Sequence, residues 1–166
     1  AVTLIRALMR GEEVDFQGRT VEFKGGSLNF APLRPDLPIY IASNSPRGLQ
    51  LAGEVADGAI ISSCATQATV DYSLGIISEG ASRTGRDIAA IDRVARLNCC
   101  IAADSQEALQ GVRMSAVRSL STYTRFAIAA GLEVTPGLID AVAQLGYTHD
   151  PQKLETLARQ APDDLI

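Results

Sequence analysis

Residues 37–62 constrain the fold more than any other part of the chain, because they read as strand, polar loop, helix, tight turn and strand. The apolar run over 39–42 predicts a strand that is covered on both faces. Ser45 then stands at the N-cap position of a helix, and Pro46 takes the first helical position, where its missing N–H costs nothing. Two buried strands joined by so short a helix are expected to be parallel, with a right-handed crossover.

The helix predicted after Pro46 carries apolar residues at three- and four-residue steps, namely Leu49, Ala52 and Val55 or Ala56. Asp57 and Gly58 end this helix, and we expect Gly58 to adopt a positive φ angle there. A second buried strand is predicted to begin at residues 59–61.

The loop before this helix is the candidate site of chemistry. A helix N-terminus presents unpaired backbone N–H groups and the positive end of the helix dipole, so Asn44, Ser45, Arg47 and Gly48 together suit a phosphate or a carboxylate. The same residues also suit a plainer interpretation, in which Ser45 only caps the helix and Arg47 is a solvated residue of its first turn. The residues alone leave both interpretations open.

The whole chain predicts an α/β fold with a parallel sheet, because strands and helices alternate along it. We expect a first helix, a hairpin within the irregular excursion 12–36, three strand–helix units and two further helices, all in a single domain over 1–166. The third strand is expected over 93–103. A (β/α)₈ barrel needs about 250 residues, and a chain of this length supplies only its later portion. Because the chain also starts without Met inside a predicted helix, we expect it to be part of a longer protein.

Composition argues against several classes of protein. The net charge of −4 and the mixing of basic with acidic residues argue against a nucleic-acid partner, which normally requires a basic face. No apolar run approaches the roughly 20 residues that a membrane helix needs, so we expect no membrane partner and a cytoplasmic location. Cys99 and Cys100 are expected to be small buried residues of a strand, and with one histidine, His149, in a loop, no metal site is predicted.

The central stretch resembles the luciferase-like monooxygenase superfamily. The resemblance rests on Pro-Ile-Tyr-Ile-Ala-Ser-Asn-Ser-Pro over 38–46 and on Leu-Ala-Gly-Glu-Val-Ala-Asp-Gly-Ala-Ile over 51–60. Within the superfamily the chain is most similar to the branch of methylenetetrahydromethanopterin reductase, whose members use the deazaflavin coenzyme F-420. Residues 7–14, 16–19 and 81–87 also resemble that branch.

The resemblance implies a (β/α)₈ barrel of the TIM type, of which this chain forms the C-terminal part, strands six to eight, with a β-hairpin insertion and extra C-terminal helices. It also implies that the loop from Asn44 to Arg47 binds the phosphate of coenzyme F-420 or FMN, and that Ser62 and Ser63 border the substrate. Sugar-phosphate dehydrogenases of the superfamily use the position of Ser62 to hold the substrate's phosphate. They carry a lysine where this chain has Ala65, so a phosphorylated sugar is not favoured.

From this resemblance we predict an oxidoreductase that transfers hydride between coenzyme F-420 and a small organic substrate, in a homo-oligomer. The sequence assigns no catalytic acid or base, and the segment by itself is expected to be inactive. Two alternatives stay open at this point. One is a reduced-FMN-dependent monooxygenase of the same fold, and the other is a non-catalytic fragment or interaction module.

Overall fold

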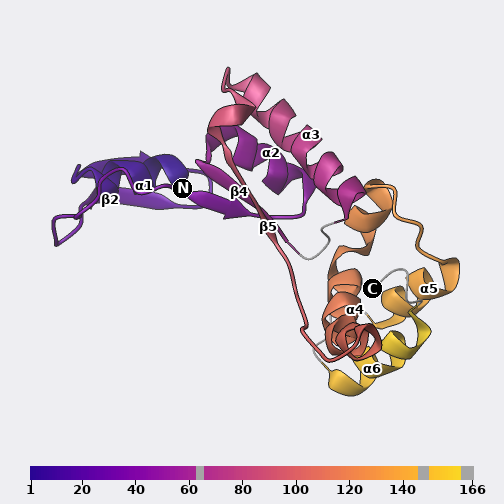
Figure 1. Ribbon diagram of the computed structural model, residues 1–166. Helices are drawn as coiled ribbons and strands as arrows, with labels where there is room; N and C mark the ends of the chain where they lie inside the picture. Colours follow the sequence, from indigo (N-terminus) through magenta and orange to yellow (C-terminus); the bar gives the residue numbers. More distant parts are fainter. Residues whose placement is uncertain (63–65, 146–149, 162–166) are drawn as a thin grey trace.

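The computed structural model describes residues 1–62, 66–145 and 150–161 (Figure 1). Its elements follow the predicted order of helix, hairpin, three strand–helix units and further helices. In chain order they are α1 (Val2–Met9), β1 (Val14–Gln17), β2 (Glu22–Gly26), β3 (Tyr40–Ala42), α2 (Pro46–Val55), β4 (Gly58–Ser62), α3 (Gln67–Arg83), a 3₁₀ turn (Ile88–Ala90), β5 (Asp92–Arg96), α4 (Ser105–Ala129), α5 (Pro136–Leu145) and α6 (Pro151–Gln160).

Strands β3, β4 and β5 form a parallel sheet in that order, and β1 and β2 form a separate antiparallel hairpin. Helices α2 and α3 cover one face of the parallel sheet (Figure 1). Ala59 and Ile61 of β4 are therefore fully buried, whereas Tyr40 and Ala42 of β3 are exposed. The prediction that the first strand is covered on both faces is wrong, because β3 lies at the edge of a sheet whose other face carries no helix among the described residues.

Gly58 is needed for a reason other than the predicted one. It opens β4, and its φ angle is not positive. Instead, the ring of Tyr40 lies over it, so that a Cβ atom at position 58 would stand 2.2 Å from Tyr40 Cε1. The Tyr40 hydroxyl passes beyond Gly58 and donates to Asp92 Oδ2 at 2.5 Å, which ties the two outer strands together across the middle one.

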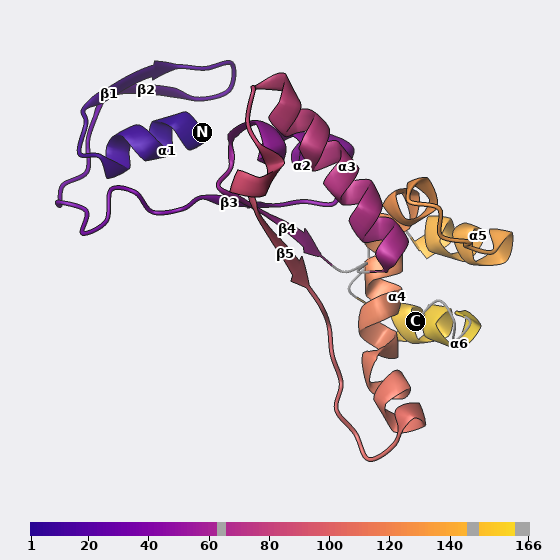
Figure 2. The same ribbon diagram turned by 45° about the horizontal axis from the view of Figure 1, so that its top comes forward.

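The third strand is shorter than predicted. β5 ends at Arg96, and residues 97–103 continue as an extended segment that leads away from the sheet toward α4 (Figure 2). Cys99 and Cys100 are exposed there, so the prediction that they are buried is wrong. The alternating pattern suits a strand, but the described part of the chain offers this segment no neighbouring strand and hence no cover.

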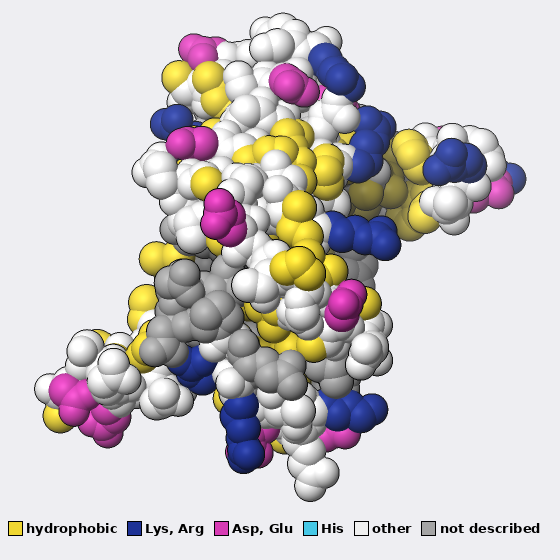
Figure 3. Space-filling model, turned by 90° about the vertical axis from the view of Figure 1, so that its right-hand side faces the viewer, with side chains coloured by type: hydrophobic (Ala, Val, Ile, Leu, Met, Phe, Trp, Pro, Cys, Tyr) yellow, Lys and Arg dark blue, Asp and Glu magenta, His cyan; other side chains and the backbone are white. Residues whose placement is uncertain are grey.

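The C-terminal helices form a second hydrophobic core, separate from the one under α2 and α3. Helix α4 contributes side chains to both cores. It bends at Tyr123, where φ and ψ are −120° and 17°. Before the bend α4 packs on α5 and α6, and beyond it Phe126 meets Tyr72 of α3 edge to face, with ring centroids 5.7 Å apart. Figure 3 faces this helical side and shows a band of hydrophobic side chains with acidic and basic ones scattered around it.

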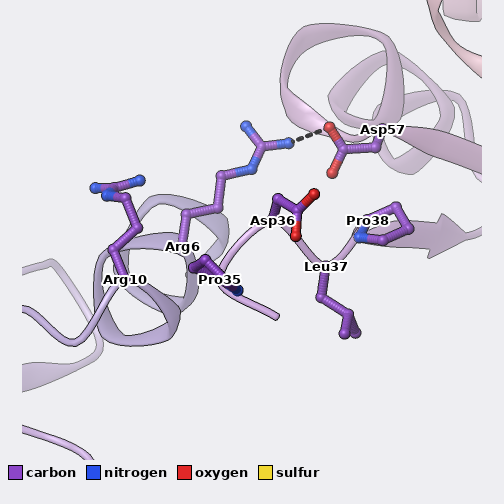
Figure 4. Close-up of a pocket in the computed structure, with 7 residues that line it drawn as sticks. All are labelled: Arg6, Arg10, Pro35, Asp36, Leu37, Pro38 and Asp57. Carbon is purple, nitrogen blue, oxygen red and sulfur yellow. Dashed lines mark hydrogen bonds and ion pairs between the residues drawn. The ribbon is translucent and has the colours of Figure 1, made fainter. Parts of the chain in front are cut away.

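At the amino ends of the strands, Asp57 fastens α1 to the sheet. Its carboxylate accepts a hydrogen bond from the Arg6 guanidinium at 2.7 Å (Figure 4). It also accepts the Ile39 N–H at 2.8 Å. Burial by itself would raise the pKa of the Asp57 carboxyl, but the bond from Ile39 and the charges of Arg6 and Arg86 outweigh it, so the pKa is lowered. A pocket opens beside this pair, lined by Arg6, Arg10, Pro35, Asp36, Leu37, Pro38 and Asp57.

Because its folded pKa is lowered, Asp57 stabilises the fold at pH values above its ordinary pKa of about 4 and loses that contribution as the pH falls through the lower, folded value. We expect Asp57→Asn to cost about 1 kcal/mol at pH 7, since the pair is partly exposed, and to cost less at pH 3. Urea unfolding of the whole protein and of the Asp57→Asn variant at pH 7 and at pH 3 measures the loss of stability at each pH. An equal loss at pH 3 and pH 7 would contradict the assignment.

Helices α2 and α3 approach each other closely at two glycines. A Cβ atom at Gly53 would lie 2.1 Å from the carbonyl oxygen of Ile77, and one at Gly80 would lie 2.1 Å from the carbonyl oxygen of Gln50. Both carbonyl oxygens belong to the helix backbone, so they cannot move away by a change of side-chain rotamer. The absence of side chains at these two positions thus sets the distance between the two helices.

We expect Gly53→Ala to destabilise the protein by about 1–3 kcal/mol, because the added methyl group forces α2 away from α3. Gly75 is the matched control, since it also lies in a helix of this pair but has no atom within 4 Å of a built Cβ. Gly75→Ala is expected to be neutral or to stabilise by about 0.5–1 kcal/mol through helix propensity. Chemical denaturation of both variants tests the difference, and similar midpoints would refute it.

Candidate functional site

The carboxyl ends of β3 and β4 lie side by side, as parallel pairing requires. Ala42 pairs with Ile60, and the Ser43 N–H donates to the Ile60 carbonyl at 3.3 Å, so the two strands run together up to the loop. The predicted loop residues and Ser62 therefore meet at one edge of the sheet. This is the edge at which parallel α/β enzymes place their ligands.

Ser45 caps helix α2, as predicted. Its Oγ accepts the Gly48 N–H at 3.1 Å. Ser43, which sequence reasoning did not single out, adds a second hydroxyl: its Oγ accepts the Ser45 N–H and lies 3.1 Å from Ser45 Oγ. Gly48 is required here because a Cβ atom would stand 2.1 Å from Ser43 Oγ. The run of three polar residues from 43 to 45 is the sequence signal that could have identified Ser43.

Arg47 is not aimed at this loop. Its guanidinium donates to Gln50 Oε1 at 3.1 Å and lies 4.0 Å from Glu54 Oε1, so the side chain runs along the outer surface of α2. The Arg47 backbone N–H, by contrast, lies in the first turn, and the described residues give it no hydrogen-bond partner. Of the predicted loop residues, Ser45 and Gly48 thus lie together at the helix N-terminus, and Arg47 contributes its main chain only.

The Asn44 side chain is buried, with 5% of its surface exposed. Its Nδ2 donates to the Ser62 carbonyl at 2.5 Å, and its Oδ1 accepts the Ser62 N–H at 3.1 Å. The Asn44 side chain thus forms hydrogen bonds with both main-chain groups of Ser62. These two bonds connect the end of β3 to the end of β4 in the way that a further pair of ladder hydrogen bonds would. Its carboxamide is thereby directed at Ser62, whereas sequence reasoning placed Asn44 among the phosphate-binding residues.

Ser62 is half-buried at the end of β4, and Ser63, the other predicted substrate residue, lies outside the described residues. In the sheet, Ser62 pairs with Arg96, the last residue of β5. Arg96 is exposed. Sequence reasoning missed it because only the strand register, which is not visible in the sequence, brings it beside Ser62.

Within the described residues, no group of three or more His, Cys, Asp or Glu side chains is placed to hold a metal ion. A search of the same residues finds no helix with the length and apolar character needed to span a membrane.

A family model described as luciferase-like monooxygenase matches residues 1–166 of this chain. The chain belongs to this family. Among curated relatives it is 33% identical over 135 residues to an F-420-dependent glucose-6-phosphate dehydrogenase of Nocardia farcinica, and 30% identical over the same length to that of Mycobacterium leprae. Each match covers 81% of this chain but only 40% of the relative.

Two solved structures share the fold of this chain. The coenzyme F-420-dependent tetrahydromethanopterin reductase of Methanopyrus kandleri gives a TM-score of 0.71 at 18% identity over 96% of this chain and 45% of its own. An F-420-dependent secondary alcohol dehydrogenase gives 0.69 at 18% identity, over 99% and 44%. The chain therefore has the α/β fold of these barrel enzymes, while its assignment to strands six to eight stays a prediction.

We expect Asn44→Ala to cost about 1–3 kcal/mol of stability, because it leaves two main-chain groups of Ser62 without partners. Amide hydrogen exchange gives a local readout: exchange of the Ser62 N–H should accelerate about tenfold or more, in line with the lost hydrogen bond. Asn44→Asp is the matched control, since it retains the acceptor for that N–H. Unchanged exchange at Ser62 in Asn44→Ala would rule out the bridge.

Proposed function

We propose that this chain is part of an F-420-dependent oxidoreductase that transfers hydride between the coenzyme and a small organic substrate. The observation that carries the proposal is the N-terminus of α2, which lies at the carboxyl edge of the sheet with the Ser43 and Ser45 hydroxyls beside it. The names of several relatives support the choice of cofactor, since both the curated dehydrogenases and the two solved enzymes are F-420-dependent.

The groups at this edge suit the phosphate of such a cofactor. The two hydroxyls, the backbone N–H of Arg47 and the positive end of the α2 dipole all favour an anion. Gly48 lets the loop fold tightly against the helix, so that these groups converge. When bound, the deazaflavin supplies the hydride chemistry, and this chain's contribution is to hold and orient it. Ser62 and Ser63 would then border the substrate.

The proposal extends to the whole protein. This chain spans about 40% of the length of the curated relatives. We assign β3, β4 and β5 to the sixth to eighth strands of a (β/α)₈ barrel, in a homo-oligomeric, cytoplasmic enzyme. The face of the sheet without helices is the inner face of a barrel, where side chains from the remaining strands pack.

Fluorescence titration of the whole protein with F-420 and, separately, with FMN tests the cofactor. We expect F-420 to bind, and Ser45→Ala to raise its Kd about tenfold or more, because a hydrogen bond to a charged group is lost. Gly48→Ala should do the same by displacing Ser43. Gly75→Ala, on α3, is the control that leaves the Kd unchanged.

Two results would overturn the proposal. Tight binding of FMN without binding of F-420 would favour the monooxygenase alternative. Binding of neither by a folded protein would favour a non-catalytic module.

A further inference from the structure

We propose that the Asp57–Gly58 peptide bond is a latent site of isoaspartate formation, which the docking of α1 through Arg6 keeps unreactive. Aspartate followed by glycine is the sequence in which this spontaneous modification is fastest, because glycine has no side chain to hinder the attacking amide. Asp57-Gly58 is the one Asp-Gly pair in the chain. None of the groups involved lies at the carboxyl edge of the sheet, so the proposal is independent of the proposed function.

The reaction rearranges the main chain without a change of mass. The Gly58 nitrogen attacks the side-chain Cγ of Asp57, and the new N–C bond closes a succinimide ring. One carboxyl oxygen leaves as water, together with the amide hydrogen and the carboxyl proton. Water then adds to the ring, and opening at the main-chain carbonyl leaves Gly58 attached through the former side chain. The product therefore has one additional methylene group in its main chain.

The sheet holds the attacking nitrogen in place. Ring closure requires rotation about the Cα–C bond of Asp57, which turns the Gly58 nitrogen toward the side chain. The Asp57 carbonyl accepts the Asp92 N–H at 2.9 Å, and this bond opposes the rotation. The Gly58 N–H donates to the Ile39 carbonyl at 3.4 Å, and Gly58 is buried under the ring of Tyr40. Attack thus requires this part of the sheet to open.

The Asp57 carboxylate is held from two sides. Oδ2 accepts the Ile39 N–H at 2.8 Å. Oδ1 accepts the Arg6 guanidinium at 2.7 Å (Figure 4). With both oxygens bonded, the side chain is not free to turn toward the Gly58 nitrogen. Arg6 belongs to α1, so the restraint on Oδ1 depends on how this helix is docked.

The same ion pair keeps the carboxyl group in its less reactive form. Water is a far better leaving group than an oxide ion, so the attack requires the protonated carboxyl. Burial raises the pKa of the Asp57 carboxyl, but the bond from Ile39 and the charges of Arg6 and Arg86 outweigh it, so the pKa is lowered. Arg6 therefore both restrains the side chain and disfavours its protonation.

Isoaspartate at position 57 would disrupt the sheet at the start of β4. This strand lies in the middle of the parallel sheet, and Gly58 pairs with Tyr40 on one side and with Asp92 on the other. A methylene group inserted immediately before Gly58 would shift both pairings. The modification would thus weaken the hydrogen bonds that otherwise prevent it.

The test follows isoaspartate at position 57 in the whole protein during a long incubation at pH 7. Peptide mapping locates the modified bond, and methylation by a protein-isoaspartate methyltransferase quantifies it. Formation should be at least about tenfold slower in the folded protein than in urea. Arg6→Gln should accelerate it about tenfold under native conditions, because a charge-assisted hydrogen bond is lost, and Arg6→Lys less, because the charge remains.

Two controls separate the effect of Arg6 from other effects. Arg10→Gln removes the same charge at the end of α1, where Arg10 pairs with Glu12 at 2.6 Å, and should change the rate less than about twofold. Asn44→Ala removes hydrogen bonds at the opposite end of the strands and measures the contribution of global unfolding. It should have little effect, because local opening at Asp57 limits the reaction.

Any of four results would overturn the inference. Equal rates in the folded protein and in urea would mean that the fold gives no protection. No acceleration by Arg6→Gln would mean that α1 takes no part in it. Equal acceleration by Arg6→Gln and Asn44→Ala would mean that the bond reacts only after global unfolding. No isoaspartate at position 57 even in urea would mean that the bond is not susceptible.

Discussion

The close contact of α2 with α3 fixes both helices on one face of the parallel sheet. With glycine at positions 53 and 80, the two helix backbones touch directly, and Leu49 and Ile77 become fully buried between them and the sheet. Because α2 starts immediately after the loop at residues 43–45, a shift of α2 away from α3 would also move the residues next to this loop. A methyl group added at Gly53 would therefore displace α2 and, with it, the loop at residues 43–45.

The second constraint is the buried carboxamide of Asn44. A buried amide is costly unless both its donor and its acceptor are satisfied, and Ser62 satisfies them together. The arrangement extends the pairing of β3 and β4 beyond the last residues of the ladder, where strands normally fray. Asn44 is thus structural, whereas the neighbouring Ser45 caps α2 and is the residue that we propose also binds the cofactor.

Sequence reasoning succeeded where the signal was local. The Ser45-Pro46 start of α2 depends on two adjacent residues, and the structure confirms it. It failed where the partner is distant: the bond from Asn44 to Ser62 joins residues 18 positions apart, and nothing in the pattern of either strand shows that their ends coincide. Gly58 illustrates the same limit, since the ring that requires it belongs to the neighbouring strand. The prediction that Cys99 is buried was wrong for a different reason. Alternation of residue types predicts a strand, but it does not show whether a neighbouring strand or helix covers it.

The two ends of the parallel sheet differ in how their polar groups are satisfied, and this difference supports the assignment of function to one of them. At the amino end, Asp57 is paired with Arg6, and the Tyr40 hydroxyl is paired with Asp92. At the carboxyl end, the described residues leave the N–H of Arg47 and the guanidinium of Arg96 without acceptors. These donors are exposed, and under the proposed function the cofactor's phosphate would supply an acceptor for the Arg47 N–H. Both ends thus contribute contacts to the fold, through Asp57 at the amino end and Asn44 at the carboxyl end, and the α2 N-terminus at the carboxyl end is where we propose that the cofactor binds.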